Sequence, residues 1–409
     1  MSKWYRLDNA AKIFPPSRNK YDAKIFRFSC SLKENVDPDI LSKALLKTLE
    51  EYPIFKSTLK RGIFCYYLEE SKIEAKVHEE NLRPCSKFAS GLLFEVTYYK
   101  KRINLEVNHA LTDGTGTLIF LKSLVANYLN QKYKLISQEV INFGSVKDVK
   151  EDAFTKYKNR KFKKALKSKK AYQIKDDKYV ENELKVIEGI VSVQDIKEKA
   201  KKYNATITEY LTSILIKSIA STRSENKSNK PIVITIPVNL RNYYPSYTVR
   251  NFFSVVNISY DYNDEDIETI ILNVKEKFAK NLSKENVQNK MNNMATLEDI
   301  FILRLVPIFL KNLVLKVICK ITDKYHTMTL SNIGIIEMPS IYENYIDYFD
   351  VFISTSTIQL CMCSYLNKMV LNFSSQFINS EIEKNFFRYL SSNGINVKIN
   401  TNRMGDSND

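Results

Sequence analysis

Residues 103–114 have the sequence INLEVNHALTDG, in which an alternating stretch leads into an HxxxDG motif. Apolar and polar residues alternate up to His109, which predicts a half-buried strand with His109 at its end, on the apolar face. After the motif, the apolar periodicity of residues 118–129 predicts a helix that a threonine caps. The sequence therefore places the motif in a short loop between a strand and a helix.

His109 has two interpretations. A histidine that leaves an apolar strand face just before a glycine-bearing loop is desolvated yet reachable, as a general base near neutral pH requires. A single histidine on such a face is also compatible with a structural role in the core, because a motif with three fixed positions is short. His78 and His326 are the only other histidines. These scattered side chains predict neither a competing histidine cluster nor a metal site.

The motif resembles that of the superfamily of chloramphenicol acetyltransferases, nonribosomal-peptide condensation domains and alcohol O-acetyltransferases, which carry HHxxxDG or HxxxDG. Asn108 replaces the first histidine of the doubled form. Two further regions are similar to the alcohol acetyltransferase branch, and one matches a late strand of the family. The two regions are WYRLDNAA at 4–11 and PVNLR at 237–241, which is followed by RNFF at 250–253. The late strand is SNIG at 331–334.

The resemblance implies an α/β (α+β, mixed-sheet) fold of two chloramphenicol-acetyltransferase-like lobes, which form a pseudo-dimer with a channel between them. It also implies that His109 is the general base and that Asp113 is structural, paired with an arginine of the other lobe. We expect Arg241 to be that partner, with Arg250 as the second candidate. Gly114 is expected to free the backbone after the motif.

The remaining site residues are candidates only. The superfamily takes its oxyanion donor from a hydroxyl of the second lobe, which points to Thr329 and Ser331, although both are equally compatible with plain strand hydroxyls. Asn108, Tyr243 and Tyr244 are candidates for lining the channel. With 25 tyrosines in the chain, a packing role for the tyrosine pair stays open.

The reaction that the resemblance implies is direct transfer of an acyl group, most simply acetyl, from acyl-CoA to the hydroxyl of a small alcohol. Acyl-CoA would be a co-substrate, and no bound cofactor is expected. One alternative is a condensation activity that forms an ester or amide from an acyl group on an acidic carrier protein. Another is a non-catalytic binding protein that kept the fold.

Chain length and charge divide the molecule further. A chain of 409 residues exceeds one ordinary core and predicts two lobes. Nine of the fifteen residues 156–170 are basic, which favours a solvated connector over a phosphate-binding patch. We expect a first lobe with the motif at 1–145 and a basic linker or crossover at 146–180. A second lobe at 181–400 and a polar tail at 401–409 follow.

A weak internal repeat supports the two lobes. Residues 369–379 follow the apolar pattern of residues 103–113, with Ser375 at the place of His109 and Asn379 at that of Asp113. Periodicity in the second half also predicts a helix that Ser192 caps and one with a capping box at Thr206. Longer elements are expected as helices at 264–282 and 286–320 and as strands near 327–336, 351–365 and 369–375.

Composition constrains partners and location. The net charge is +16, and lysine outnumbers arginine 49 to 13. This excess of lysine is typical of AT-rich bacterial codon usage, whereas phosphate recognition favours arginine. We therefore expect no nucleic-acid partner. A basic surface would still attract coenzyme A or an acidic carrier protein. Six cysteines without a CxxC pair predict free thiols in a reducing cytoplasm, and we expect a monomer.

The most apolar helical stretch, residues 301–320, contains Arg304, Lys311 and Lys316, so it is not expected to span a membrane. An amphipathic helix that covers a lobe is favoured, and a position in a membrane interface is the alternative.

Overall fold

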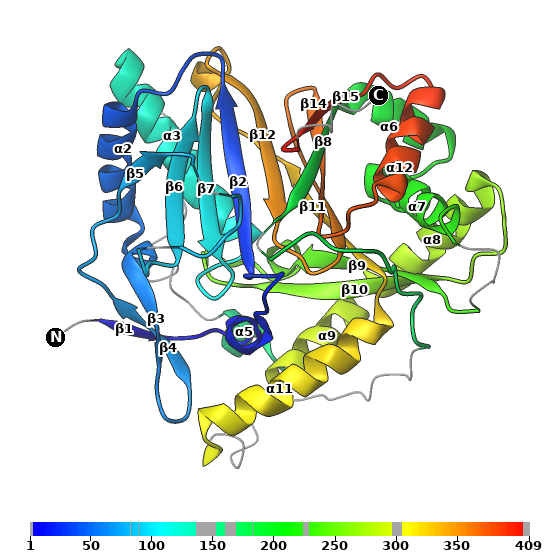
Figure 1. The fold of residues 1–409 in the computed structure, drawn as a ribbon, viewed down its shortest axis with the longest axis horizontal. Helices are drawn as coiled ribbons and strands as arrows, with labels where there is room; N and C mark the ends of the chain where they lie inside the picture. The colour runs from blue at the N-terminus through cyan, green and yellow to red at the C-terminus, as the bar shows by residue number, and fades with distance from the viewer. Residues whose placement is uncertain are drawn as a thin grey trace.

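The computed structural model describes residues 3–81, 83–88, 90–135, 153–159, 169–181, 183–223, 229–296 and 305–403. They form two mixed sheets with helices packed against them, and a small third sheet near the N-terminus (Figure 1). This arrangement confirms the α/β mixed-sheet fold of two lobes.

The first lobe is built on a five-stranded sheet. Helix α2 (Pro38–Glu51) begins where the Asp37 carboxylate accepts two backbone N–H groups, and it packs against α3 (Gly114–Tyr133). Leucines on one side of α2 enter the core, because helical positions three to four residues apart share a face. In spatial order the strands are β12 (Ile346–Ile353), β2 (Ile25–Leu32), β7 (Arg102–Asn108), β6 (Phe94–Tyr99) and β5 (Val77–Glu79).

The second lobe is built on a seven-stranded sheet. Its strands, in spatial order, are β10 (Phe253–Tyr260), β9 (Ile232–Asn239), β11 (Met328–Ile335), β13 (Ile358–Tyr365), β14 (Lys368–Ser375), β8 (Lys185–Ser192) and β15 (Lys398–Thr401). The helices of this lobe are α6 (Val193–Lys202), α7 (Ile207–Ala220), α8 (Ile267–Asn281), α9 (Lys284–Thr296), α11 (Ile308–Thr322) and α12 (Glu381–Ser392). The caps predicted at Ser192 and Thr206 are confirmed.

Short elements complete the molecule. The third sheet has the order β1 (Trp4–Arg6), β4 (Tyr66–Glu70) and β3 (Ser57–Arg61). Helix α1 (Phe14–Ser17) follows β1 in the chain, and α5 (Ala153–Tyr157) lies in the region predicted as the connector.

The strand predicted at 351–365 is wrong. The chain forms β12 up to Ile353 and starts β13 at Ile358, and the two strands belong to different sheets. β12 pairs antiparallel with β2 and so completes the sheet of the first lobe. The polar residues 354–357 (STST) lie between the two strands, and this short run marks the crossing that the prediction missed. The boundaries of the predicted lobes stay a prediction, but one strand from the second half of the chain lies in the first sheet.

The predicted helix at 286–320 is also not continuous in the described residues. α9 ends at Thr296 and α11 begins after Pro307, where the proline precedes the first helical residue. The prediction that this region covers a lobe is wrong for α11, since Ile308 is its only buried residue. No helix in the described part of the chain is both long and apolar enough to cross a membrane.

The two hairpins of the predicted repeat occupy equivalent places. β7 forms a hairpin with β6 and pairs on its other side with β2, the first strand of its sheet in the chain. β14 forms a hairpin with β13 and pairs on its other side with β8, which begins the second lobe. A long helix follows each, α3 in the first copy and α12 in the second. Strand order therefore confirms the repeat.

The connector and tail are partly bound to the body. Phe154 on α5 is fully buried, so this part of the predicted connector is not a solvated segment. Most of the basic stretch, residues 160–168, lies outside the described residues. Thr401 still belongs to β15, and the Asn402 side chain bonds Leu184 and Val186. The tail predicted from residue 401 thus begins no earlier than residue 404, beyond the described residues.

Candidate active site

His109 lies one residue beyond β7, as the alternating pattern predicts. Its backbone N–H donates to the Lys24 carbonyl at 2.9 Å, which extends the pairing of β7 with β2. Three phenylalanine rings surround its imidazole. Phe14 stacks on it with centroids 4.3 Å apart, and Phe26 and Phe253 lie at 4.5 Å and 6.0 Å.

This aromatic environment sets the charge of the imidazole. Burial lowers the pKa of His109 from 6.5 to about 4, and the Asp113 carboxylate opposes that shift only in part. The imidazole is therefore neutral at pH 7, the state in which one ring nitrogen can accept a proton. A stacked ring does not block this nitrogen, because its lone pair lies in the plane of the imidazole.

Asn251 decides which nitrogen accepts. Its Nδ2 donates to Asp8 Oδ2 and to the His109 carbonyl, at 3.1 Å each, so both amide hydrogens have acceptors. The Oδ1 atom is left to face His109 Nδ1 at 3.4 Å. Since that oxygen can only accept, Nδ1 carries the hydrogen and Nε2 carries the lone pair. The geometry thus selects Nε2 as the basic atom.

A buried aspartate fixes the orientation of this amide. Asp8 is fully buried, and its carboxylate accepts the backbone N–H groups of Ala11, at 2.7 Å, and Asn251, at 3.3 Å. Arg250 Nε lies 3.6 Å from the same carboxylate. Arg250 is therefore the partner of Asp8, and the alternative pairing of Arg250 with Asp113 is wrong.

Asp113 pairs with Arg241, as predicted. The guanidinium donates from Nη1 to Oδ2 at 2.8 Å and from Nη2 to Oδ1 at 3.4 Å, a two-point contact between nearly buried groups. Asp113 also accepts the Phe252 N–H at 2.8 Å and caps α3 through the Gly116 N–H at 3.0 Å. The cap is therefore this aspartate and not the predicted threonine, because its carboxylate lies directly before the first turn.

The residues 248–252 form a loop of the second lobe that lies on the motif. Arg241 donates to three carbonyls of this loop, those of Thr248, Arg250 and Phe252. Thr112 donates to a fourth, the carbonyl of Val249. Both lobes thus hold the motif in one network of hydrogen bonds.

Two glycines allow this close approach. A β-carbon on Gly116 would lie 2.1 Å from the Val249 carbonyl oxygen, so no other residue fits there without moving the loop. A β-carbon on Gly114 would lie 3.2 Å from Ile333 Cδ1, a contact with a flexible side chain. The sequence predicts that Gly114 frees the backbone. The structure requires a glycine more strictly at Gly116, where a β-carbon would collide with a backbone carbonyl.

The predicted oxyanion donors, Thr329 and Ser331, lie on β11. On β11, Met328 and Leu330 enter the core of the second lobe, so Thr329 and Ser331 lie on the opposite face. Ile333, further along β11, contacts Gly114 and packs with the first lobe. β11 therefore runs beside the motif, and the oxyanion role of its hydroxyls stays a prediction.

The candidates for channel lining take part in packing. Asn108 Oδ1 accepts the Ala110 N–H at 3.0 Å, which stabilises the turn into the motif. Tyr243 donates to the Leu282 carbonyl at 2.9 Å, and Tyr244 donates to the Gln288 side chain. Each of these side chains thus forms a hydrogen bond within the protein. That they line a channel stays a prediction.

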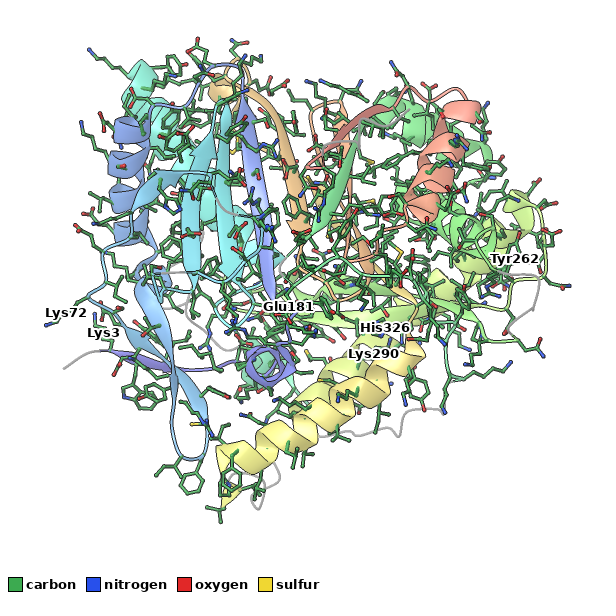
Figure 2. The ribbon with its side chains drawn as sticks, in the orientation of Figure 1. Lys3, Lys72, Glu181, Tyr262, Lys290 and His326 are labelled. Atoms are coloured by element: carbon green, nitrogen blue, oxygen red, sulfur yellow. The ribbon has the colours of Figure 1, made fainter. Side chains whose placement is uncertain are left out.

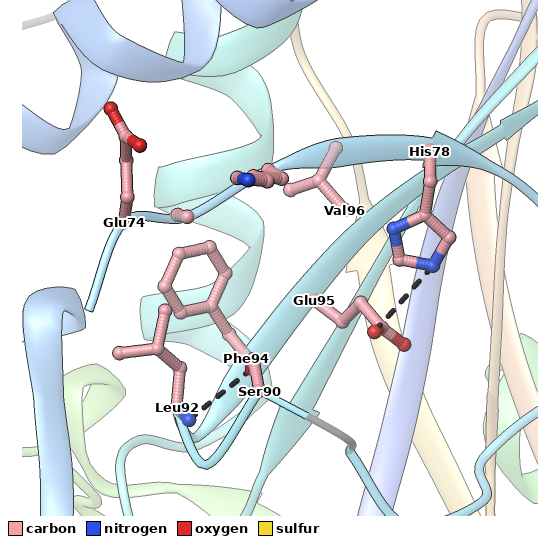
Figure 3. A pocket seen from close by; sticks show the side chains of 9 residues that line it. Glu74, His78, Ser90, Leu92, Phe94, Glu95 and Val96 are labelled. Carbon is pink, nitrogen blue, oxygen red and sulfur yellow. Dashed lines mark hydrogen bonds and ion pairs between the residues drawn. The ribbon is translucent and has the colours of Figure 1, made fainter.

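The other histidines lie on other segments of the chain. His326, labelled in Figure 2, precedes β11 in the second lobe. His78 lies on the edge strand β5, where its Nε2 is 3.5 Å from Glu95, beside a pocket of about 340 Å³ (Figure 3). None of the residues that line this pocket belongs to the network around His109. The six cysteines are free thiols in the structure.

The sequence missed Asn251 and Asp8. Both lie in stretches that carry the family resemblance, but Asn251 is 142 residues from His109, so no local spacing joins them. A fully buried aspartate needs partners, yet burial itself is not visible in the sequence.

Solved structures with the same fold cover almost the whole chain. The polyketide synthase associated protein 5 of Mycobacterium tuberculosis is 13% identical, with a TM-score of 0.62 over 95% of this chain and 96% of that one. The trichothecene 15-O-acetyltransferase of Fusarium sporotrichioides is 11% identical, with a TM-score of 0.61 over 95% and 94%. A variant starter condensation domain of rhizomide synthetase, solved with C8-CoA and Leu-SNAC, is 9% identical, with a TM-score of 0.61 over 95% and 94%.

These identities show a shared fold. No curated protein has a significant sequence match to the chain. The model of the Transferase family matches residues 74–329, more than half of the chain, including the HxxxDG motif and Arg241. The protein therefore belongs to the Transferase family, as its resemblance to the acetyltransferase and condensation-domain superfamily predicts.

Proposed function

We propose that the protein transfers an acyl group from acyl-CoA to the hydroxyl of an alcohol, with His109 as the general base. The observation that carries this proposal is the neutral imidazole, whose Nδ1 faces an acceptor and whose Nε2 therefore holds the lone pair. Both lobes contribute to its surroundings, as a reaction between two bound substrates requires.

The reaction needs no covalent enzyme intermediate. Nε2 takes the proton of the alcohol as its oxygen attacks the thioester carbonyl, and a tetrahedral intermediate forms. Its oxyanion requires a hydrogen-bond donor, for which we propose Ser331 or Thr329 on β11. The intermediate then collapses, the C–S bond breaks, and His109 returns the proton to the thiolate. The products are an ester and free coenzyme A.

Relatives in fold support acyl-CoA as the donor. One structural neighbour is an O-acetyltransferase, and another was solved with C8-CoA. The net charge of +16 favours a polyanionic donor. The free thiols fit a reducing compartment, and we place the protein in the cytoplasm.

Thiol release tests the proposal. Purified protein is incubated with acetyl-CoA or longer acyl-CoAs and a panel of alcohols and amines, and the acylated product is identified by mass spectrometry. Ester formation that His109→Ala abolishes supports the proposal. Transfer only from an acyl carrier protein would favour the condensation activity, and release that is unchanged in His109→Ala would reject the proposed base.

A further inference from the structure

Helix α11 has its apolar side turned outward. Seven of its large apolar side chains are 43–62% exposed, whereas Asn312 and Lys311 lie on the inner side and bond Tyr66 and Phe64. At 3.6 residues per turn, the exposed apolar positions cover about half of the helix circumference. They are Phe309, Leu310, Leu313, Val314, Val317, Ile318 and Ile321.

The apolar surface continues onto the turn between β3 and β4. The Ile308 N–H donates to the Ile63 carbonyl at 2.8 Å, which joins the start of α11 to this turn. Ile63 and Phe64 are 72% and 45% exposed, and Leu305 is 59% exposed. We call the seven helix residues together with Ile63, Phe64 and Leu305 the α11 face. Helix α11 lies along the lower edge of the molecule in the view of Figure 1, and Figure 2 shows side chains around it in the same view.

Cations border this apolar face. Lys316 and Lys320 are exposed at its edge, and Lys324 follows the helix. Helix α11 itself contains no acidic residue. An apolar face with lysines at its border is typical of a helix that lies in the plane of a membrane interface.

The charges argue against a second copy as the occupant. In a two-fold contact each α11 face would meet the same face of the partner, which also carries Lys316 and Lys320. No carboxylate of α11 is available to compensate them. An anionic bilayer instead offers acyl chains to the apolar face and phosphates to its lysines.

We propose that the α11 face is a docking surface for an anionic lipid bilayer. The helix lies in the interface plane, with its apolar residues among the acyl chains and Lys316 and Lys320 at the headgroups. Helix α11 also packs on α1, whose Phe14 stacks on His109. The docked surface is therefore separated from the imidazole by one short helix. Docking itself does not depend on the proposed reaction.

Vesicle co-sedimentation tests the docking. The probe is a vesicle of equal parts phosphatidylcholine and phosphatidylglycerol, with pure phosphatidylcholine as the comparison. Wild type should bind the anionic vesicles more tightly, and high salt should weaken this binding. The double variant Leu313→Asp with Val317→Asp should lower the partition coefficient at least tenfold. Leu272→Asp on α8, where Leu272 is 58% exposed, is the matched control and should bind as wild type.

A spectroscopic readout avoids dependence on the charged variants. Trp4 is the only tryptophan, so Phe309→Trp in a Trp4→Phe background reports on α11 alone, and its emission should shift to the blue on anionic vesicles. Wild type that stays in the supernatant would overturn the proposal, as would equal binding by the double variant. A dimer that the double variant abolishes, without vesicle binding, would assign the face to a second copy.

Discussion

The two hairpins of the repeat end in different chemistry. His109 follows β7 and lies among three aromatic rings, whereas Ser375 is the last residue of β14 and is fully buried. Four residues on, both copies bind the start of the next helix with a side chain. Asp113 accepts the Gly116 N–H at 3.0 Å, and Asn379 accepts the Glu381 N–H at 2.7 Å.

The difference lies in what reaches each hairpin from the other lobe. Arg241 and the loop 248–252 bind Asp113 and surround His109. Ser375 is instead satisfied by its own chain, since its Oγ accepts the Phe377 N–H at 3.0 Å. Asp113 is the N-cap of α3, whereas Asn379 precedes the N-cap of α12, Ser380, and bonds the first helical N–H in a short turn. Only the first copy has a charge that the second lobe binds. We infer that the repeat accounts for the shared order of strands and helix. The contact between the lobes then forms the site around His109.

The largest expected effect separates the two strand ends. His109→Ala should lower the turnover of acyl transfer about a hundredfold to ten-thousandfold, because the general base is lost. Ser375→Ala, the matched change in the second copy, should leave turnover within about threefold. Steady-state kinetics of both variants, with circular dichroism to check folding, measures the contrast. Equal rates for the two variants would remove the chemical distinction between the copies.

The next effect concerns Asp113 and its counterpart in the repeat, Asn379. Asp113→Ala leaves the buried Arg241 charge without its partner and should lower the free energy of unfolding by about 3–5 kcal/mol. Asn379→Ala removes only one hydrogen bond in the turn before α12 and should cost about 1 kcal/mol. Urea denaturation followed by circular dichroism compares the two. A cost for Asp113→Ala as small as that for Asn379→Ala would mean that the ion pair is not the basis of the difference.

Acid pH should also distinguish the copies. The pKa of His109 is lowered to about 4 in the folded protein, so the unfolded chain binds its proton first as the pH falls from 6.5. This histidine therefore makes stability decrease between pH 6.5 and pH 4, and kcat/KM should fall only near pH 4. His109→Ala should weaken this part of the pH dependence of unfolding, whereas Ser375→Ala should retain it. An acid limb of kcat/KM near pH 6.5 would contradict the buried, neutral histidine.

The smallest effect tests how Asn251 positions the base. Asn251→Ala removes the contact with His109 Nδ1, worth about 1 kcal/mol, together with the bonds that the amide donates to Asp8 and to the His109 carbonyl. Both imidazole tautomers then become available, so kcat should fall about fivefold to tenfold with little change in KM. In the second copy, Phe377 bonds Ser375 through its backbone, so Phe377→Leu should leave kcat unchanged. A fall in kcat after Asn251→Ala that is matched by an equal loss of folded protein would mean a structural role only.

Local patterns predicted much of this molecule. The alternation before His109 placed it at a strand end, and the caps at Ser192 and Thr206 follow from side chains a few residues away. Short-range patterns succeed because capping and strand alternation involve neighbours in the chain. The pair of Asp113 and Arg241 came instead from the family resemblance, since no spacing rule links residues that far apart.

The failures have a common physical cause. The sequence does not show that Asn251 meets His109, that β12 leaves its neighbour β13 for another sheet, or that α11 turns its apolar side outward. Each depends on which surfaces meet in three dimensions. Apolar periodicity states that a helix has two faces, but it does not state which face the rest of the protein covers.

The strand exchange at β12 has a consequence for synthesis on the ribosome. β2 needs β12 as its neighbour, yet roughly 240 residues separate the end of β7 from the start of β12. At about 5–20 residues per second, the ribosome needs on the order of 10–50 s to supply them. Throughout that interval the nascent first sheet exposes the unpaired edge of β2, a surface that invites pairing with other chains. We therefore expect nascent chains to depend on chaperones until β12 has left the ribosomal tunnel.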